Sequence, residues 1–344
     1  MSDGQVVLRV NRFSLRLVHR SLLTNGVLAL LLSLLVGFAL GSGSLNVSPA
    51  VITDWLLQRD VGWTETTVLE ILRAPRILLA ATCGGMLALA GAVTQHVTRN
   101  GLADPGLIGV KAGASLCIVA LLLTWPEAPL ALRPIVGLAG GLAAGLSVAF
   151  LARGASPLKF IMIGVGCSWC LSSMLVVLLT AADIRSLQRA MIWLAGSLEG
   201  ANWPSVYLAS AILACLAAII LSLARHAELA DMGAAKASTL GVNIKGVRAT
   251  CLIATVLLVA GAVSVAGGLG FVGLIAPHLT RLLPRQGLRG HLISSTLIGG
   301  LLVLAADLLG AGLFAPIRLP VGVTLAMIGA PLLVLLLWLR RNRI

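Results

Sequence analysis

The sequence predicts an all-α polytopic membrane protein, and three observations lead to this fold class. First, 58% of the 344 residues are hydrophobic and only 11% are charged, and the mean hydropathy is +1.03. Second, nearly charge-free stretches about twenty residues long recur along the chain, and an α-helix needs this length to cross a bilayer. Third, the basic residues fall mainly between these stretches. The net charge of +13 is therefore better explained by the positive-inside rule than by nucleic-acid binding.

We expect ten spanning helices in a single transmembrane domain that takes in residues 1–344. The apolar stretches cover residues 22–42, 77–97, 107–125, 134–152, 160–180, 204–224, 249–266, 268–282, 292–313 and 320–339. The third and eighth are short or interrupted, and Pro277 is expected to break the eighth. The first stretch follows four arginines but is long for a signal peptide, so we expect an uncleaved span. Residues 51–70 and 182–203 look partly helical and carry tryptophans, which is typical of the outer membrane interface.

The distribution of lysine and arginine predicts that both chain ends lie inside. With ten spans, eighteen of the 25 basic residues, Lys111 among them, fall on the side of the N-terminal arginines, and seven fall on the other side. The six cysteines lie inside apolar stretches, so we expect no disulfide framework. In the fourth span, Gly137, Gly141 and Gly145 form a ridge that lets a neighbouring helix approach closely.

Motifs for nucleotide binding and catalysis are absent from the sequence. There is no GxxxxGK[ST] motif, no HExxH motif and no nucleophile elbow. Gly268, Gly270 and Gly273 spell GxGxxG, but the strand–turn–helix context that this motif requires is missing. His278 has no companion ligands nearby in the sequence. We therefore expect no catalytic residues, no resident cofactor and no metal site.

Residues 225–248 form the longest expected inner segment. They mix charged residues with small apolar ones and are interpreted as two short helices separated by Gly233. This composition fits docking into a cleft of another protein, and an ordinary solvated loop is the alternative.

Three charged residues near the outer side are candidates for function. Arg73 and Arg76 lie three residues apart at the outer end of the second span, so they share one helix face. They could receive carboxylates from a partner, and interfacial snorkelling is the alternative. Asp307 lies inside the ninth span, where an acid must face the bundle or a wet cavity. A structural hydrogen-bonding role is favoured for it over a proton relay.

Four blocks of sequence together resemble the permease subunits of the iron–siderophore and vitamin B12 class of ABC importers, the FecCD-type transmembrane family. The blocks are LRAPRILLA…GGMLALAGAVTQHVTRNGLADPGLIGVKAGAS, ADMGAAKASTLGV, GLGFVGLIAPHLTRLL and ADLLGAGLFAPIRLPVGVTLAMIGAPLLVLLL. They occur in the family's order and run from about residue 70 to the C-terminus. The resemblance implies the type II ABC importer permease architecture, with the chain in the inner (cytoplasmic) membrane.

The resemblance also implies partners. They are two ATP-binding subunits, a periplasmic or lipoprotein substrate-binding protein, and a second permease subunit that is either a paralogue or an identical copy. The ATPase-facing role then maps onto Glu228, Gly233, Ala237, Leu240 and Gly241. Docking of the binding protein maps onto Arg73 and Arg76. The position of a further family arginine is near Ala311 here, so Arg318 is its substitute.

The family's inner gate includes the loop after the second span, which usually reads RNPLADPG. Here Gly101 replaces the first proline. Irregular backbone at membrane depth is tolerated where it is buried in protein or lines water, and glycines absorb changes in dihedral angles. We therefore interpret residues 98–113 as a gate that contains a hinge, with Asn100, Gly101 and Leu102 on the pathway.

The expected function is translocation of iron(III)–siderophore complexes, powered by separate ATPase subunits, so the chain itself is not an enzyme. The same machine carrying cobalamin or haem is one alternative. A secondary transporter is another, but it would need coupling-ion ligands at the midplane, where only Asp307 is charged.

Overall fold

The computed structural model describes residues 5–10, 13–43, 45, 47–129, 132–153, 157–231, 239, 241–284, 286–313 and 317–340. Regular structure in these residues is helical apart from a hairpin that the sequence analysis did not predict. In this hairpin, β1 (Gln5–Val10) pairs antiparallel with β2 (Phe13–Val18). The all-helical architecture of the predicted spans is confirmed.

A helix overlaps each predicted apolar stretch. In chain order the helices are α1 (His19–Gly41), α2 (Pro49–Leu56), α3 (Trp63–Thr67), π-helical η1 (Val68–Arg73), α4 (Ala74–Thr98), 3₁₀-helical η2 (Pro105–Ile108), α5 (Val110–Thr124), α6 (Leu132–Leu151), α7 (Pro157–Thr180), α8 (Ile184–Leu194), α9 (Trp203–Asp231), α11 (Ile244–Ala266), α12 (Val272–Thr280), α13 (Leu288–Gly312) and α14 (Val321–Arg340). By length and composition, seven helices in the described residues could cross a membrane. Among the others, α5 has 15 residues and α12 has nine.

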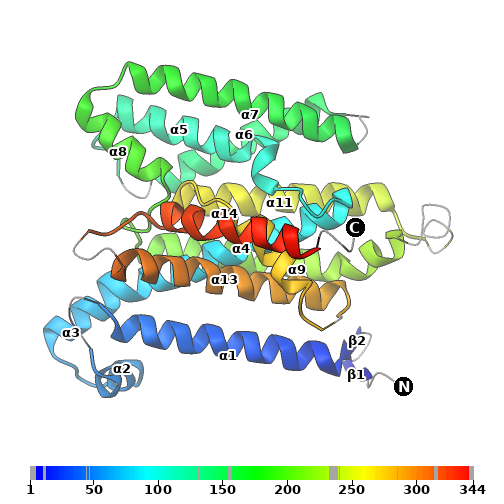
Figure 1. Ribbon diagram of the computed structural model, residues 1–344, viewed down its shortest axis with the longest axis horizontal. Coiled ribbons are helices and arrows are strands. Elements are labelled where there is room, and N and C mark those ends of the chain that lie inside the picture. Colours follow the sequence, from blue (N-terminus) through cyan, green and yellow to red (C-terminus); the bar gives the residue numbers. More distant parts are fainter. Residues whose placement is uncertain are drawn as a thin grey trace.

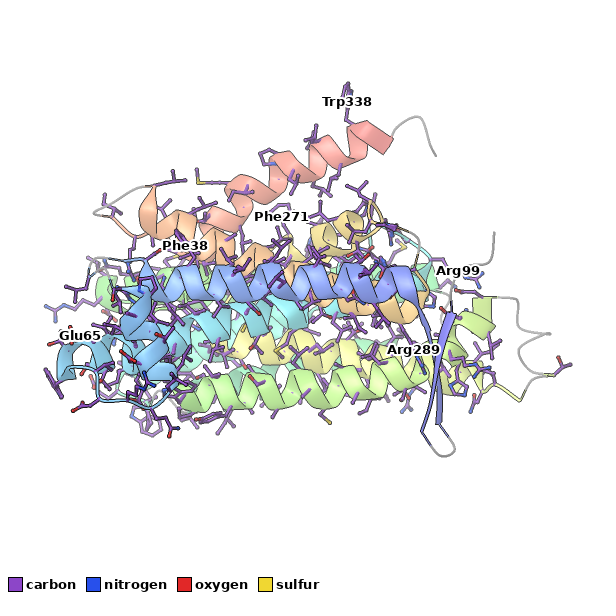
Figure 2. All side chains as sticks on the ribbon, turned by 90° about the horizontal axis from the view of Figure 1, so that it is seen from below. Phe38, Glu65, Arg99, Phe271, Arg289 and Trp338 are labelled. Carbon is purple, nitrogen blue, oxygen red and sulfur yellow. The ribbon has the colours of Figure 1, made fainter. Side chains whose placement is uncertain are left out.

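The two ends of the bundle carry different elements. Figure 1 shows α2, α3 and α8 at one end, which we call the outer end, and the hairpin at the other, which we call the inner end. Figure 2 places Glu65 at the outer end, Arg99 and Arg289 at the inner end, and Phe271 between them. The two expected interfacial segments do contain helices.

Side-chain caps explain where the short outer helices begin. Ser48 Oγ accepts a hydrogen bond from the backbone N–H of Val51 at the start of α2. Asp183 accepts from the N–H groups of Arg185 and Ser186 at the start of α8, at 3.1 Å each. Both are preferred N-cap residues, because their oxygens replace the missing helical acceptors.

The centre of the bundle is α4. Of the residues in its most apolar window, 83% are buried, against 6% in α7, which runs along the edge of the bundle in Figure 1. Glycines let α4 approach its neighbours: a Cβ atom at Gly84 would collide with the backbone carbonyl of Gly299 in α13, and one at Gly91 would collide with that of Gly273 in α12. Backbone contact of this kind is what small residues permit between membrane helices.

The glycine ridge predicted in α6 packs against α11. Cβ atoms at Gly141 and Gly145 would lie 2.9 Å from Ala260 Cβ and 2.6 Å from Val256 Cγ1. The ridge therefore sets the close approach of these two helices, as predicted.

The break in the eighth apolar stretch comes before α12 and not at Pro277. Residues 267–271 are not helical; Gly267 has φ +70°, Phe271 has φ +66°, and Pro277 lies inside α12. A proline has no N–H, so the carbonyl four residues earlier, that of Gly273, loses its helical donor. Gln95 Nε2 of α4 donates to that carbonyl at 3.3 Å. A neighbouring helix thus supplies the missing hydrogen bond, and α12 continues through the proline.

Candidate functional site

The predicted docking residue Arg76 makes an ion pair inside the chain. Its Nε donates to Asp307 Oδ2 at 2.9 Å, and its Nη2 donates to Oδ1 at 2.7 Å. The side chains are 17% and 8% exposed. A guanidinium and a carboxylate that meet through two parallel bonds form one of the strongest charge-assisted contacts in proteins. The structural hydrogen-bonding role expected for Asp307 is confirmed, and its partner is Arg76.

The other two predicted docking residues differ in exposure: Arg73 is half-buried, and Arg318 is exposed. Arg73, at the end of η1, donates from Nη1 to Leu40 O at 2.5 Å and from Nη2 to Leu45 O. It therefore connects the end of α1 and the segment after it to the start of α4. Arg318 lies in the segment before α14 and is exposed. The docking role of the three arginines stays a prediction, and Arg318 is the most accessible of them.

At the inner end, Glu228 connects α9 to α13. Its Oε1 accepts a hydrogen bond of 2.6 Å from the backbone N–H of Leu288, the first residue of α13. The N-cap residue Gly287 offers no side chain of its own. A carboxylate at a helix N-terminus also interacts favourably with the helix dipole. Glu228, a residue of α9, therefore caps the N-terminus of α13.

One turn further on, Asp231 connects α9 to α4. Its carboxylate lies 3.6 Å from His96 Nε2 and 3.4 Å from Arg99 Nη2. These contacts are long, and the Arg99 and Asp231 side chains are 59% and 48% exposed. The end of α9 thus touches the inner ends of both α4 and α13, and it forms the first part of the segment predicted to face the ATPases.

Of the other predicted ATPase-facing residues, Gly241 lies in a turn with φ +76°, and apart from its chain neighbours no atom of the described residues lies within 4 Å of the position that a Cβ atom would take there. Gly233, Ala237 and Leu240 lie outside the described residues. The coupling role of this set stays a prediction.

The predicted gate loop begins where Arg99, with φ +53°, ends α4 in the left-handed conformation. Asn100 Oδ1 accepts from the N–H of Leu102 at 2.9 Å, and the Leu102 side chain is 50% exposed. A Cβ atom at Gly101 would lie 2.8 Å from Nη1 of Arg281, a residue of the inner end whose Nη2 donates to Gln95 Oε1 at 2.7 Å. The loop therefore rests on a basic side chain that is itself anchored to α4.

Beyond Leu102 the chain turns back into the bundle. Asp104 Oδ1 accepts from the N–H of Gly106 at 3.2 Å, and Pro105 packs against Gly273 of α12. Lys111 then lies beside Gly268, the second residue after α11. The expectation that Lys111 belongs to the inner surface is wrong, because the loop re-enters the bundle before α5 begins. Buried irregular backbone of this kind needs protein around it to satisfy its polar groups.

A cavity of about 470 Å³ opens at the inner end. Its lining includes His96, Glu228, Asp231, Arg281 and His291. Sequence reasoning missed His96, Asp231 and Arg281 as members of this cavity, and it missed Gln95, which holds Arg281. The only local signal for this site was the polar pair Gln95 and His96 at the end of an apolar stretch. The residues that these two contact come from helices far apart in the sequence.

Comparisons with known proteins match nearly the whole chain. Residues 30–339 match the FecCD transport family. The Fe(3+) dicitrate transport system permease protein FecD of Escherichia coli is 37% identical, over 88% of this chain and 95% of the relative. The Fe(3+)-citrate import system permease protein YfmE of Bacillus subtilis is 35% identical, over 92% and 95%. The hemin transport system permease protein HmuU of Yersinia pestis is 32% identical, over 92% and 96%.

Among solved structures, a protein described as a metal-chelate type ABC transporter in an inward-facing conformation is similar in fold. The TM-score is 0.80 at 28% identity, with 91% of this chain and 98% of that chain covered.

Proposed function

Because this chain belongs to the FecCD transport family, we propose that it is the permease subunit of a binding-protein-dependent ABC importer for iron(III) chelates. The observation that carries the proposal is the family match over residues 30–339, together with the shared fold at 28% identity. The chain resides in the inner membrane, and ATP hydrolysis belongs to partner subunits. Those partners are two ATP-binding subunits, a substrate-binding protein and a second permease subunit.

The proposed topology has ten spans with both chain ends inside. Two features support it. Glu65 and the inner-end arginines lie at opposite ends of the bundle (Figure 2), as the lysine and arginine distribution requires. In addition, the short helices α5 and α12 are each preceded by irregular backbone that lies inside the bundle, and this backbone adds length where the helices alone fall short.

The proposed coupling site is the end of α9 with the segment that follows it. Glu228 and Asp231 contact α13 and α4 there. An ATPase that moves this segment would therefore pull directly on two helices, one of which leads into the gate loop with Asn100, Gly101 and Leu102. Docking of the binding protein is proposed for the outer end, with exposed Arg318 as the first candidate.

The proposed cargo is an iron(III) chelate such as a citrate or siderophore complex, because relatives of 37% and 35% identity carry Fe(3+)-citrate names. Haem is the second candidate, and the similarity to the hemin permease favours it. A secondary transporter is disfavoured, because the carboxylate of Asp307 is already occupied by Arg76.

Reconstitution tests this proposal. The chain is coexpressed with candidate permease, ATPase and binding-protein partners, and the purified assembly is placed in proteoliposomes. We expect uptake of iron(III) dicitrate or a ferric siderophore that requires internal ATP and the binding protein. A matched assembly whose ATPase carries a disabled P-loop lysine should show no uptake. Uptake that continues without any ATPase would reject the proposal, and preference for hemin or cobalamin over iron chelates would correct the cargo.

A further inference from the structure

A second cavity, of about 270 Å³, lies at the outer end of the bundle, beside α8. Residues of α5, α6, α8, α9 and α11 line it, together with the loop that joins α8 to α9. No residue that lines it belongs to α7 or α14, two helices with long exposed faces. Five helices and one loop of this chain therefore contribute to the cavity.

Arg133, the second residue of α6, lines this cavity, and its Nε lacks a partner in the described part of the chain. Its Nε is shielded from solvent and has no hydrogen-bond acceptor among the described residues. An arginine side chain stays protonated in proteins and offers five donors. A shielded donor without an acceptor is unfavourable, and such groups are rare in native proteins, so each one calls for a specific explanation such as a functional role.

The charges around Arg133 favour an anion. Arg189 of α8 lines the same cavity, and the one interaction of its guanidinium in the described residues is a hydrogen bond of 3.2 Å from Nη2 to Ser186 Oγ. The lining holds one acid, the exposed Glu199, against these two arginines. The side-chain oxygens of Ser197 and Asn202 already accept hydrogen bonds from backbone N–H groups. An excess of positive charge with unused donors therefore faces the cavity.

We propose that this cavity binds a carboxylate group through Arg133 and Arg189. The planar guanidinium matches a carboxylate through two parallel hydrogen bonds, and the Arg76–Asp307 pair shows that geometry in the same molecule. The volume lies just below the range of roughly 300–1,000 Å³ typical of drug-sized ligands. The site therefore takes a small organic acid or the end of a larger one, and not a whole ferric chelate.

Two sources could supply the carboxylate. One is a small acid free in solution, and the other is an acidic side chain of a binding protein docked on the outer end. The second source rests on the proposed function, whereas the carboxylate site itself does not.

The first experiment titrates acetate and citrate into the purified full chain in nanodiscs, with calorimetry and thermal unfolding as readouts. We expect binding that Arg133→Gln weakens by about tenfold or more, the loss expected when a charge-assisted bidentate contact is removed. The control is Arg185→Gln, which removes an exposed arginine of α8 that does not line the cavity. It should bind citrate like the parent chain.

Folding of the variant is checked without ligand. Because Arg133→Gln removes a shielded Nε–H donor that has no acceptor in the described residues, the unliganded variant should melt at the same temperature as the parent chain or above it. A lower melting temperature together with unchanged citrate binding would show that Arg133 has only a structural role, and would overturn the proposal. Binding of acetate only after Glu199→Gln would show that Glu199 occupies the site itself, and would also overturn it.

The second experiment measures the affinity of the assembled transporter for its binding protein, with and without citrate. Weaker docking in Arg133→Gln together with competition by citrate identifies a protein side chain as the source. Citrate binding with unchanged docking identifies a free acid. If citrate does not bind and docking is also unchanged in Arg133→Gln, the proposed site is overturned. ATP-dependent uptake, measured separately, reports on the proposed function, so the two can fail independently.

Discussion

The two ends of the α4–α13 pair are held together by contacts of different kinds. At the outer end, Arg76 and Asp307 meet through two short hydrogen bonds, with both side chains largely buried. At the inner end, the pair is connected through α9, by the long and exposed contacts of Asp231 and by one hydrogen bond from Leu288 N–H to Glu228. Between the ends, the helices touch backbone to backbone at Gly84 and Gly299.

This difference indicates where the molecule can move. A buried pair that loses its partner leaves an uncompensated charge, and breaking it costs several kcal/mol. An exposed pair contributes little and exchanges readily with water. The outer half of α4 and α13 should therefore move as one body, while the exposed contacts of Asp231 at the inner end can break at low cost. These exposed contacts lie beside the proposed gate and the proposed coupling segment.

The largest effect is expected from Asp307→Asn. It leaves the guanidinium of Arg76 buried without a counter-charge, so the free energy of unfolding should fall by about 3–5 kcal/mol. Reversible unfolding in mixed micelles, followed by tryptophan fluorescence, measures this change.

Asp54→Asn is the matched control, because Asp54 pairs with Arg59 at 3.1 Å in an exposed position and should matter by less than about 1 kcal/mol. The double variant Arg76→Met/Asp307→Leu, which removes both charges, should recover most of the loss. Equal losses of stability in Asp307→Asn and Asp54→Asn would contradict the inference that the outer end is rigid.

The next effect is expected at the crossing of the two helices. Gly84→Ala should destabilise the chain by about 1–3 kcal/mol, because its Cβ would collide with the Gly299 carbonyl and force the helices apart. In α1, a Cβ atom added at Gly26 would meet no atom within 4 Å outside its own stretch of helix. Gly26→Ala should instead raise the free energy of unfolding by up to about 1 kcal/mol, because alanine has the higher helix propensity. The same unfolding measurement reads both. Effects of the same sign would show that the crossing is not tightly packed.

Smaller effects are expected at the inner end. Glu228→Ala removes the acceptor for Leu288 N–H and should cost about 1 kcal/mol, as loss of a helix cap does, whereas Glu228→Gln keeps an oxygen acceptor and should cost less. Asp231→Ala should cost less than about 1 kcal/mol. Hydrogen exchange at the first amides of α13 separates the two residues, since only Glu228→Ala should speed it. Faster exchange in Asp231→Ala alone would reverse the assignment.

The smallest effect concerns the pH response of α8 at the outer end. Hydrogen bonds from Ser186, and from the N–H of Arg185, lower the pKa of the Asp183 carboxyl. A lowered pKa in the folded state means that the cap stabilises α8 above the ordinary Asp value of about 3.9 and is lost as the pH falls through the lower, folded value.

Exchange of the first amides of α8 should therefore accelerate only below a pH of about 4, after correction for intrinsic rates. Asp183→Asn, which still caps but does not titrate, should show no such change. Identical profiles for the parent chain and this variant would remove the carboxylate from the explanation.

The sequence predicts the apolar helices well, because each helix corresponds to one continuous apolar segment, and the hydropathy of a segment depends only on its own residues. It fails at α12, because Gly267 and the residues after it leave the helical conformation, and Pro277 is tolerated only with help from another helix. It also predicts that Asp307 needs a partner, since a charge in a span is unfavourable without one.

Which residue that partner is could not be predicted from one sequence. Asp307 and Arg76 are 231 positions apart, and only the packing of α4 on α13 brings them together. The same holds for Glu228 and Leu288 N–H. The resemblance assigned Glu228 to a partner protein, whereas the fold first uses its carboxylate inside the chain.

The hydrogen bond from Gln95 to the Gly273 carbonyl has a consequence for how this chain can diverge. Pro277 lacks the N–H that would bond to the Gly273 carbonyl, and Gln95 supplies a side-chain N–H in its place. If Pro277 changed to a residue with an N–H, α12 would close its own hydrogen bond and Gln95 would lose this role. If Gln95 changed first, a carbonyl would be stranded inside the bundle. We therefore expect the two positions to be inherited as a pair among descendants of this sequence, although they lie on different helices.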